Sequence, residues 1–254
     1  MTPHRIGNVV AAPPQRAPSS LLRGLAWSLV LSVTLTLVLA WPVVRSPRTM
    51  VFGREIAGRH HDPFTVMQHF ESGGAAAPYR QPVTDVAGAW LAAKIGAAPS
   101  YNILVLLSFP LTTLATYLLG IYLFGSPFGA AAAALLFTFA PAHVAQASYH
   151  VHVAQTQWLA FYLLALCACV DRPTALRCTA LLASVAGLAL SNDYGGLTGA
   201  VMTPLALPIY WASRGRERTW PGLLIPAATL AMALTAGVLL IMRSAPVLLT
   251  ARER

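Results

Sequence analysis

Charged residues are scarce in this sequence. Asp, Glu, Lys and Arg make up 10% of its 254 residues, whereas apolar types make up 56%. A soluble domain normally carries about a quarter charged residues. With a mean hydropathy of +0.61, the chain would need more apolar burial in water than a core of this chain length provides. The scarcity of charge excludes an ordinary soluble domain and predicts an integral membrane protein.

Cysteine and ligand motifs are scarce as well. Cys167, Cys169 and Cys178 lie in or beside apolar segments, so disulfides are not expected. No further Cys or His stands at zinc spacing from Cys167-x-Cys169, and no fixed spacing supports a His/Asp metal site. We therefore predict no cofactor, and a divalent metal stays an open alternative that ligand spacing does not support. The net charge of +9 is spread over segments between apolar runs, which favours membrane-flanking loops over binding to nucleic acid.

Long apolar runs are what the sequence has instead. A spanning helix needs roughly 20 mostly apolar residues, and the runs predict an all-α, polytopic transmembrane bundle. We expect about seven spans, at about 24–44, 101–124, 127–147, 153–170, 174–191, 194–213 and 221–243. Because Pro141 interrupts the third, AHVAQAS is expected to form a separate short helix at the outer surface. The predicted divisions are a tail at 1–23, a membrane domain at 24–243 and a tail at 244–254.

The arginines predict an orientation. The short segments 171–177 and 214–220 together contain five Arg, and those near 148–152 and 191–196 contain no Lys or Arg. Short loops rich in Lys and Arg face the cytoplasm. This predicts a cytoplasmic N-terminus and places the long 45–100 loop outside.

The outer loop has two helix signals, each with a proline at its first position. The first predicts a helix over about 63–72, with Asp62 as its N-cap. The second predicts a helix over about 82–96, with Trp90 and Lys94 on one side. Because this pairing of Trp with a basic residue suits a membrane interface, we expect two short helices on the outer membrane surface.

Polar residues that remain on the outer side allow two interpretations each. Asp62 is either a helix cap or a chemical group, and the two roles are compatible. Asp85 falls in the first helical turn, where the helix dipole favours an acid. His150 and His152 lie near a membrane boundary, where a half-polar ring is well accommodated.

The order of these features resembles membrane glycosyltransferases of the GT-C superfamily, and more closely their YfhO-like or mannosyltransferase-like bacterial members. The segments that carry the resemblance are HDPF (61–64), YRQPVTDVAGAWLA (79–92), YNILVLLSFPLTTLATYLL (101–119) and LLFTFAPAHVAQASYHVHVAQTQWLAFYLLAL (135–166). The resemblance implies a protein of the inner (plasma) membrane. Its expected activity is transfer of a sugar from a polyprenyl-phosphate donor to an acceptor at the outer face.

The resemblance also implies residue roles. Asp62 would be the catalytic acid of the outer loop, acting as general base or positioning the acceptor, with Asp85 as the alternative. The other expected substrate-binding residues are Arg59, His60, His61, Arg80, Asp85, His150, His152 and Gln155. The first four would supply charge or hydrogen bonds to the leaving phosphate.

Two further hypotheses compete with an active enzyme. Members of this superfamily usually continue through more spans, so the resemblance implies that this chain corresponds to an N-terminal half. It would then be truncated, non-catalytic, or completed by a partner subunit. A small-solute transporter is disfavoured because ionisable residues are almost absent from the span interiors.

Overall fold

The structure is a computed structural model that describes residues 18–53, 62–73 and 81–235. Its α-helices are α1 (Pro18–Leu39), α2 (Trp41–Arg45), α3 (Asp62–Glu71), α4 (Pro82–Ile95), α5 (Ala97–Phe124), α6 (Pro127–Thr138), α7 (Pro141–Tyr149), α8 (Gln157–Asp171), α9 (Ala175–Ser191), α10 (Asp193–Ser213) and an unlabelled helix, Trp220–Thr235. A 3-10 turn, Gly215–Glu217, follows α10. These ranges contain no strand, which confirms the all-α prediction.

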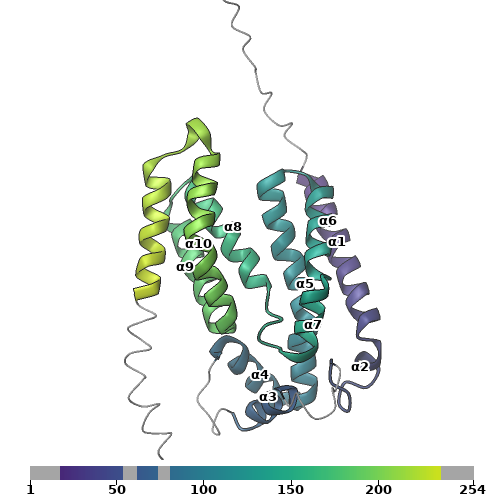
Figure 1. Ribbon diagram of the computed structural model, residues 1–254. Helices are drawn as coiled ribbons and strands as arrows, with labels where there is room; N and C mark the ends of the chain where they lie inside the picture. The colour runs from purple at the N-terminus through teal and green to yellow at the C-terminus, as the bar shows by residue number, and fades with distance from the viewer. Residues whose placement is uncertain (1–17, 54–61, 74–80, 236–254) are drawn as a thin grey trace, which may run out of the picture.

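The helices form two groups that meet at α5 (Figure 1). One group contains α1, α5, α6 and α7, and the other contains α8, α9, α10 and the helix Trp220–Thr235. Helix α5 packs against α1 and α6 in its own group and against α8 in the other. The short helices α3 and α4 cover one end of both groups, since α4 contacts α5 as well as α9.

Glycine and proline set several of the helix ends. Gly96, at φ +91°, separates α4 from α5, and Gly125, at φ +62°, ends α5 in the left-handed conformation, which glycine adopts without a Cβ penalty. Pro141 begins α7, which is bent by 43° from α6. The predicted break of the third apolar run into two helices is therefore confirmed.

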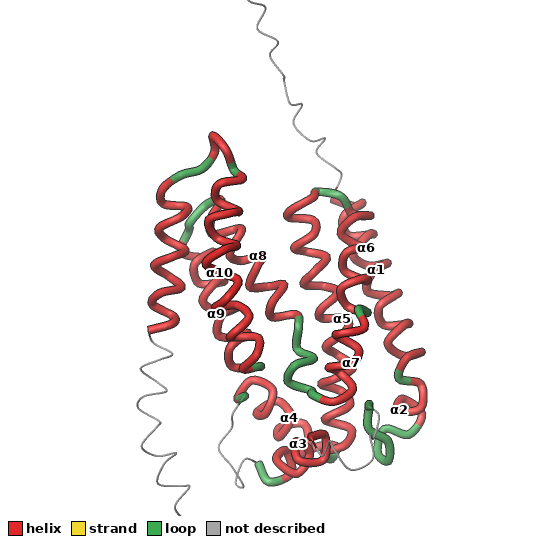
Figure 2. Tube along the Cα trace, in the orientation of Figure 1, coloured by secondary structure: helices red, strands yellow, loops and turns green. Residues whose placement is uncertain are grey.

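The fourth predicted span is too long at its start. We expected a helix from 153, but α8 begins at Gln157, and residues 150–156 form turns that connect the two helix groups (Figure 2). Side-chain bonds hold this connection in place. The Gln155 amide donates to the carbonyls of Leu104 (3.3 Å) and Val151 (2.9 Å). The connection is therefore fixed against α5 although it is not helical.

Polar side chains pack between helices, whereas apolar ones cover the outside of α1. Trp27, Val30 and Val38 are exposed, but Ser32 is fully buried. The Thr113 hydroxyl, on α5, donates to Ser32 Oγ over 2.8 Å. Small hydroxyl residues at interfaces and apolar residues outside are typical of helices packed in lipid.

Two helices are long and apolar enough to cross a membrane, the stretch Ser19–Leu39 of α1 and the whole of α5. The bent pair α6 and α7 would make a third if it forms one span. Three further apolar helices, α8, α9 and Trp220–Thr235, are shorter. By length and composition the described residues thus provide two or three candidate spans.

Helix α4 agrees with its prediction almost to the residue. Val86 and Trp90 are exposed on one side, and Lys94 Nζ lies 3.9 Å from the centre of the Trp90 ring. Helix α3 begins at Asp62, one residue before its predicted start.

Candidate functional site

Helices α3 and α4 are brought together by a close contact between Phe70 and Gly88. The Phe70 side chain is 1% exposed, and a Cβ added at Gly88 would lie 2.2 Å from its ring. Only glycine leaves room for the ring, so this contact fixes the end of α3 against α4. His69, which precedes Phe70, thereby comes close to the first turn of α4.

Asp85 is the centre of the polar cluster at this end of the molecule. Its side chain is buried, and Oδ1 lies 2.7 Å from Nε2 of His152. Oδ2 accepts the backbone N–H of Gln81 over 3.0 Å and lies 3.8 Å from Nε2 of His69. One carboxylate thus joins α3, the start of α4 and the connection between α7 and α8.

The surroundings keep the Asp85 carboxyl ionised. Burial by itself raises its pKa, but the hydrogen bonds from His152 and the Gln81 N–H, together with electrostatic attraction to the rings of His152 and His69, outweigh burial and lower the pKa below its usual value. At neutral pH, Asp85 is therefore an acceptor for the ring N–H of His152.

This bond determines which nitrogen of His152 can act as a base. An ionised carboxylate accepts a proton, so Nε2 of His152 carries the hydrogen and Nδ1 is left with its lone pair. The described residues provide Nδ1 with no hydrogen-bond partner. An acid that orients a histidine whose other nitrogen is available has the geometry of an Asp–His general-base pair.

Unsatisfied polar atoms lie on three segments at this end of the fold. Thr84 Oγ1 donates to the carbonyl of Ser191 over 3.3 Å, which joins α4 to the end of α9. The Ser191 hydroxyl is buried and has no hydrogen-bond partner within the described ranges. The same is true of Gln81 Oε1 and Gln157 Oε1. Since buried polar atoms are normally bonded, these three are places for water or a polar ligand.

The other predicted site residues have different positions. Gln155 bonds to two backbone carbonyls, and its Oε1 accepts from Gln157 over 2.8 Å, so its amide is engaged within the fold. His150 is the C-cap of α7. Asp62 is the first residue of α3, seven residues before His69, but its side chain lies outside the described part. Arg59, His60, His61 and Arg80 also lie outside the described residues.

The sequence interpretation missed the pairing itself. His69 received no role, and Asp85 was expected to serve mainly the helix dipole. Asp85 and His152 are 67 residues apart, so no local motif joins them. The only signal was that both belong to segments expected on the same side of the membrane.

Comparison with known proteins adds no family assignment: no protein-family model, curated protein or solved structure matches the chain. Within residues 18–53, 62–73 and 81–235, no group of three or more His, Cys, Asp or Glu is placed to hold a metal ion. The functional argument therefore rests on the geometry around Asp85.

Proposed function

We propose that the protein is a membrane-embedded glycosyltransferase that moves a sugar from a polyprenyl-phosphate donor to an acceptor hydroxyl at the outer face. The observation that carries this proposal is the bond between the buried Asp85 carboxylate and His152. The pair supplies a base for the acceptor, and the sequence resemblance supplies the donor class.

His152 takes the proton in the proposed reaction. The acceptor O–H gives its proton to Nδ1 while its oxygen forms a bond to the anomeric carbon of the sugar. The bond from that carbon to the phosphate oxygen breaks, and the phosphate leaves with the electron pair. Asp85 stabilises the imidazolium that forms, because its carboxylate already accepts the Nε2 proton.

His69 is well placed to assist this pair. Its Nε2 lies 3.8 Å from Asp85 Oδ2, and its ring stands at the end of α3. Asp62 begins the same helix, roughly 10 Å away along its axis. In the proposed site Asp62 positions the acceptor, and Arg59, His60, His61 and Arg80 bind the leaving phosphate.

The proposed setting is the inner membrane, with the N-terminus in the cytoplasm and α3 and α4 on the outer surface. About seven spans are proposed, including the shorter apolar helices beyond α5 and the bent pair. Support comes from the hydroxyl-lined helix contacts, the exposed apolar face of α1 and the Arg-rich segments at the end away from Asp85.

A non-catalytic role has support from the same bond. Asp85 accepts the Gln81 N–H and contacts His69, so the cluster also ties α4 to its neighbours. In this second candidate, the protein is a membrane subunit in which the Asp85–His152 pair only stabilises the outer end.

Transfer measured in proteoliposomes separates the two candidates. The purified chain is incubated with radiolabelled polyprenyl-phosphate mannose or glucose and a membrane extract that supplies acceptors. With the wild type, we expect the lipid donor to lose its label. In His152→Ala, we expect the rate of sugar transfer to fall at least about a hundredfold, the range typical of a lost general base. Thr113→Val, which changes a hydroxyl on α5 far along the chain from the pair, is the matched control and should retain transfer.

Full transfer by a folded His152→Ala protein would refute the catalytic role of the pair. No transfer from either donor by the wild-type chain, together with normal unfolding behaviour, would favour the non-catalytic subunit.

A further inference from the structure

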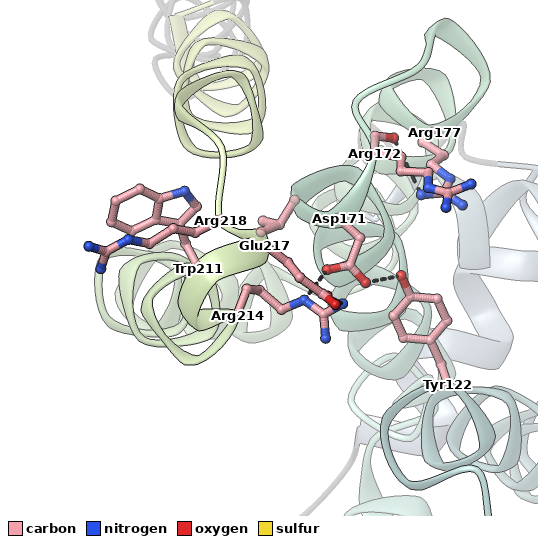
Figure 3. A pocket seen from close by; sticks show the side chains of 9 residues that line it. Tyr122, Asp171, Arg172, Arg177, Trp211, Arg214, Glu217 and Arg218 are labelled. Carbon is pink, nitrogen blue, oxygen red and sulfur yellow. Dashed lines mark hydrogen bonds and ion pairs between the residues drawn. The ribbon is translucent and has the colours of Figure 1, made fainter. Parts of the chain in front are cut away.

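A second polar site lies at the opposite end of the helices. It is a cavity of about 410 Å³ between the end of α8, the start of α9 and the turn after α10 (Figure 3). The charged residues that line it are Arg172, Arg177, Arg214, Arg218, Asp171 and Glu217. These residues come from the segments 171–177 and 214–220, which the sequence marks only as two separate Arg-rich loops.

Asp171 organises one wall of this cavity. It is the last residue of α8, where the helix dipole disfavours a negative charge. Three neighbours offset this cost: Tyr122 donates to Oδ2 over 2.5 Å, Tyr210 donates to Oδ2 over 3.1 Å, and Arg214 Nε lies 2.9 Å from Oδ1. The contacts join α5, α8 and α10, so this wall is built by three helices.

The arginines exceed the acids in the cavity. Arg214 contacts both carboxylates, since its Nη2 also lies 3.1 Å from Glu217 Oε2. Four arginines and two acids leave two positive charges in excess. Within the described ranges, Arg172, Arg177 and Arg218 contact no carboxylate. The cavity is therefore electropositive and is suited to an anion.

Two of these guanidinium groups are held in place without being neutralised. Arg177 Nη1 donates to the carbonyl of Ala168 over 2.7 Å. The Arg218 guanidinium lies 5.2 Å from the Trp211 ring centre. Neither contact supplies a full negative charge, so both side chains retain donors for a ligand.

We propose that this cavity binds a phosphate group. The guanidinium fork matches phosphate oxygens in pairs, and the excess of two positive charges matches the charge of about −1.5 to −2 on a phosphate monoester. Either a lipid headgroup or a soluble phosphate presents this chemistry. The proposed transfer reaction occurs at Asp85, at the other end of the bundle, so this site is a separate binding function.

Binding to the full-length protein in detergent micelles tests the proposal. The probes are inorganic phosphate, short-chain phosphatidic acid and, as the uncharged-headgroup control, short-chain phosphatidylcholine. The variant is Arg172→Gln with Arg218→Gln, because both side chains are exposed and contact no carboxylate in the described structure. The matched control is Arg23→Gln, which removes an exposed arginine near the start of α1, at the same end of the molecule but outside the cavity.

We expect phosphatidic acid, inorganic phosphate or both to bind the wild type, and at least about tenfold weaker binding in the double variant. Binding of phosphatidic acid alone identifies a lipid phosphate, and binding of inorganic phosphate identifies a soluble one. Arg23→Gln should stay within about twofold. The proposal is overturned if neither phosphate probe binds, if phosphatidylcholine binds as well as phosphatidic acid, or if the double variant matches the wild type while both are folded by circular dichroism.

Discussion

Removing the His152 side chain should lower the free energy of unfolding because it leaves the Asp85 carboxylate without its hydrogen-bond donor. In His152→Ala, the Asp85 carboxylate stays buried, with only the Gln81 N–H and the more distant His69 to compensate its charge. Leaving a buried acceptor without its donor costs about 1–3 kcal/mol, and more when the acceptor is charged. The His152 side chain is 16% exposed, so we expect about 3 kcal/mol. Asp85→Asn removes the charge itself and should cost about 1.5 kcal/mol, the value of a charged hydrogen bond.

The double variant reveals whether these two costs come from one interaction. Once Asp85 is replaced by Asn, no buried charge is left uncompensated when His152 becomes Ala. The two costs should therefore fall short of additivity by about 2 kcal/mol. The free energy of unfolding is measured by titrating detergent-solubilised protein with sodium dodecyl sulfate and following helix content by circular dichroism.

Two substitutions at distant positions provide the reference for this double-mutant comparison of Asp85 and His152. Thr113 bonds to Ser32 and Thr138 between α1, α5 and α6, and it shares no partner with Asp85. The costs of Thr113→Val and Asp85→Asn should add within about 0.5 kcal/mol. If the costs of Asp85→Asn and His152→Ala also add within about 0.5 kcal/mol, Asp85 and His152 do not stabilise each other, and the argument for an oriented base fails.

Two more outcomes follow from the same end of the molecule. Gly88→Ala should displace Phe70 and cost about 1–2 kcal/mol of unfolding free energy. Gly129→Ala is the control: its new Cβ would meet its nearest atoms at 3.5 Å, so this change should be neutral or slightly stabilising. Equal effects of the two changes on thermal unfolding would contradict the close contact between Phe70 and Gly88. Because the pKa of Asp85 is lowered by folding, its stabilising contribution should be complete above about pH 4 and should be lost as the pH falls further. The stability difference between wild type and Asp85→Asn, measured from pH 6 to pH 2, should therefore shrink on the acid side, and a difference that grows there would reverse the assigned sign.

Several helix ends were predictable because single residues determine them, whereas α1 begins at Pro18 and ends at Leu39 although the span was predicted at 24–44. Pro82 and Pro141 stand in the first turns of their helices, and Gly125 follows α5 in a conformation that favours glycine. These are local backbone effects, so they can be read along the chain. The start of α8 was not predictable in this way. Val153 and Ala154 extend the apolar run that follows them, but side-chain bonds to α5 hold residues 150–156 out of a helix.

The candidate site was predictable as a list of residues but not as an arrangement. Asp85 and His152 were both selected because polar residues are scarce, which makes each one conspicuous. Their contact depends on how α4 lies across the end of α5 and on the turn that presents His152. Asp62 was ranked first because of a family resemblance, and that role stays a prediction because its side chain lies outside the described residues. Packing between distant segments brings Asp85 and His152 together, and sequence spacing carries no information about it.

The separation of the two polar ends gives a physical reason to place them on opposite sides of a bilayer. Helix α5 touches both: Leu104 accepts from Gln155 in the connection that carries His152, and Tyr122 donates to Asp171 in the arginine cavity. These two α5 positions are separated by eighteen residues, or about 27 Å along a helix, close to the roughly 30 Å hydrocarbon core of a membrane. The α5 segment between them contains no charged residue. In the proposed arrangement α5 crosses the lipid, and this spacing would leave both the proposed base and the proposed phosphate site next to water, which each of them needs.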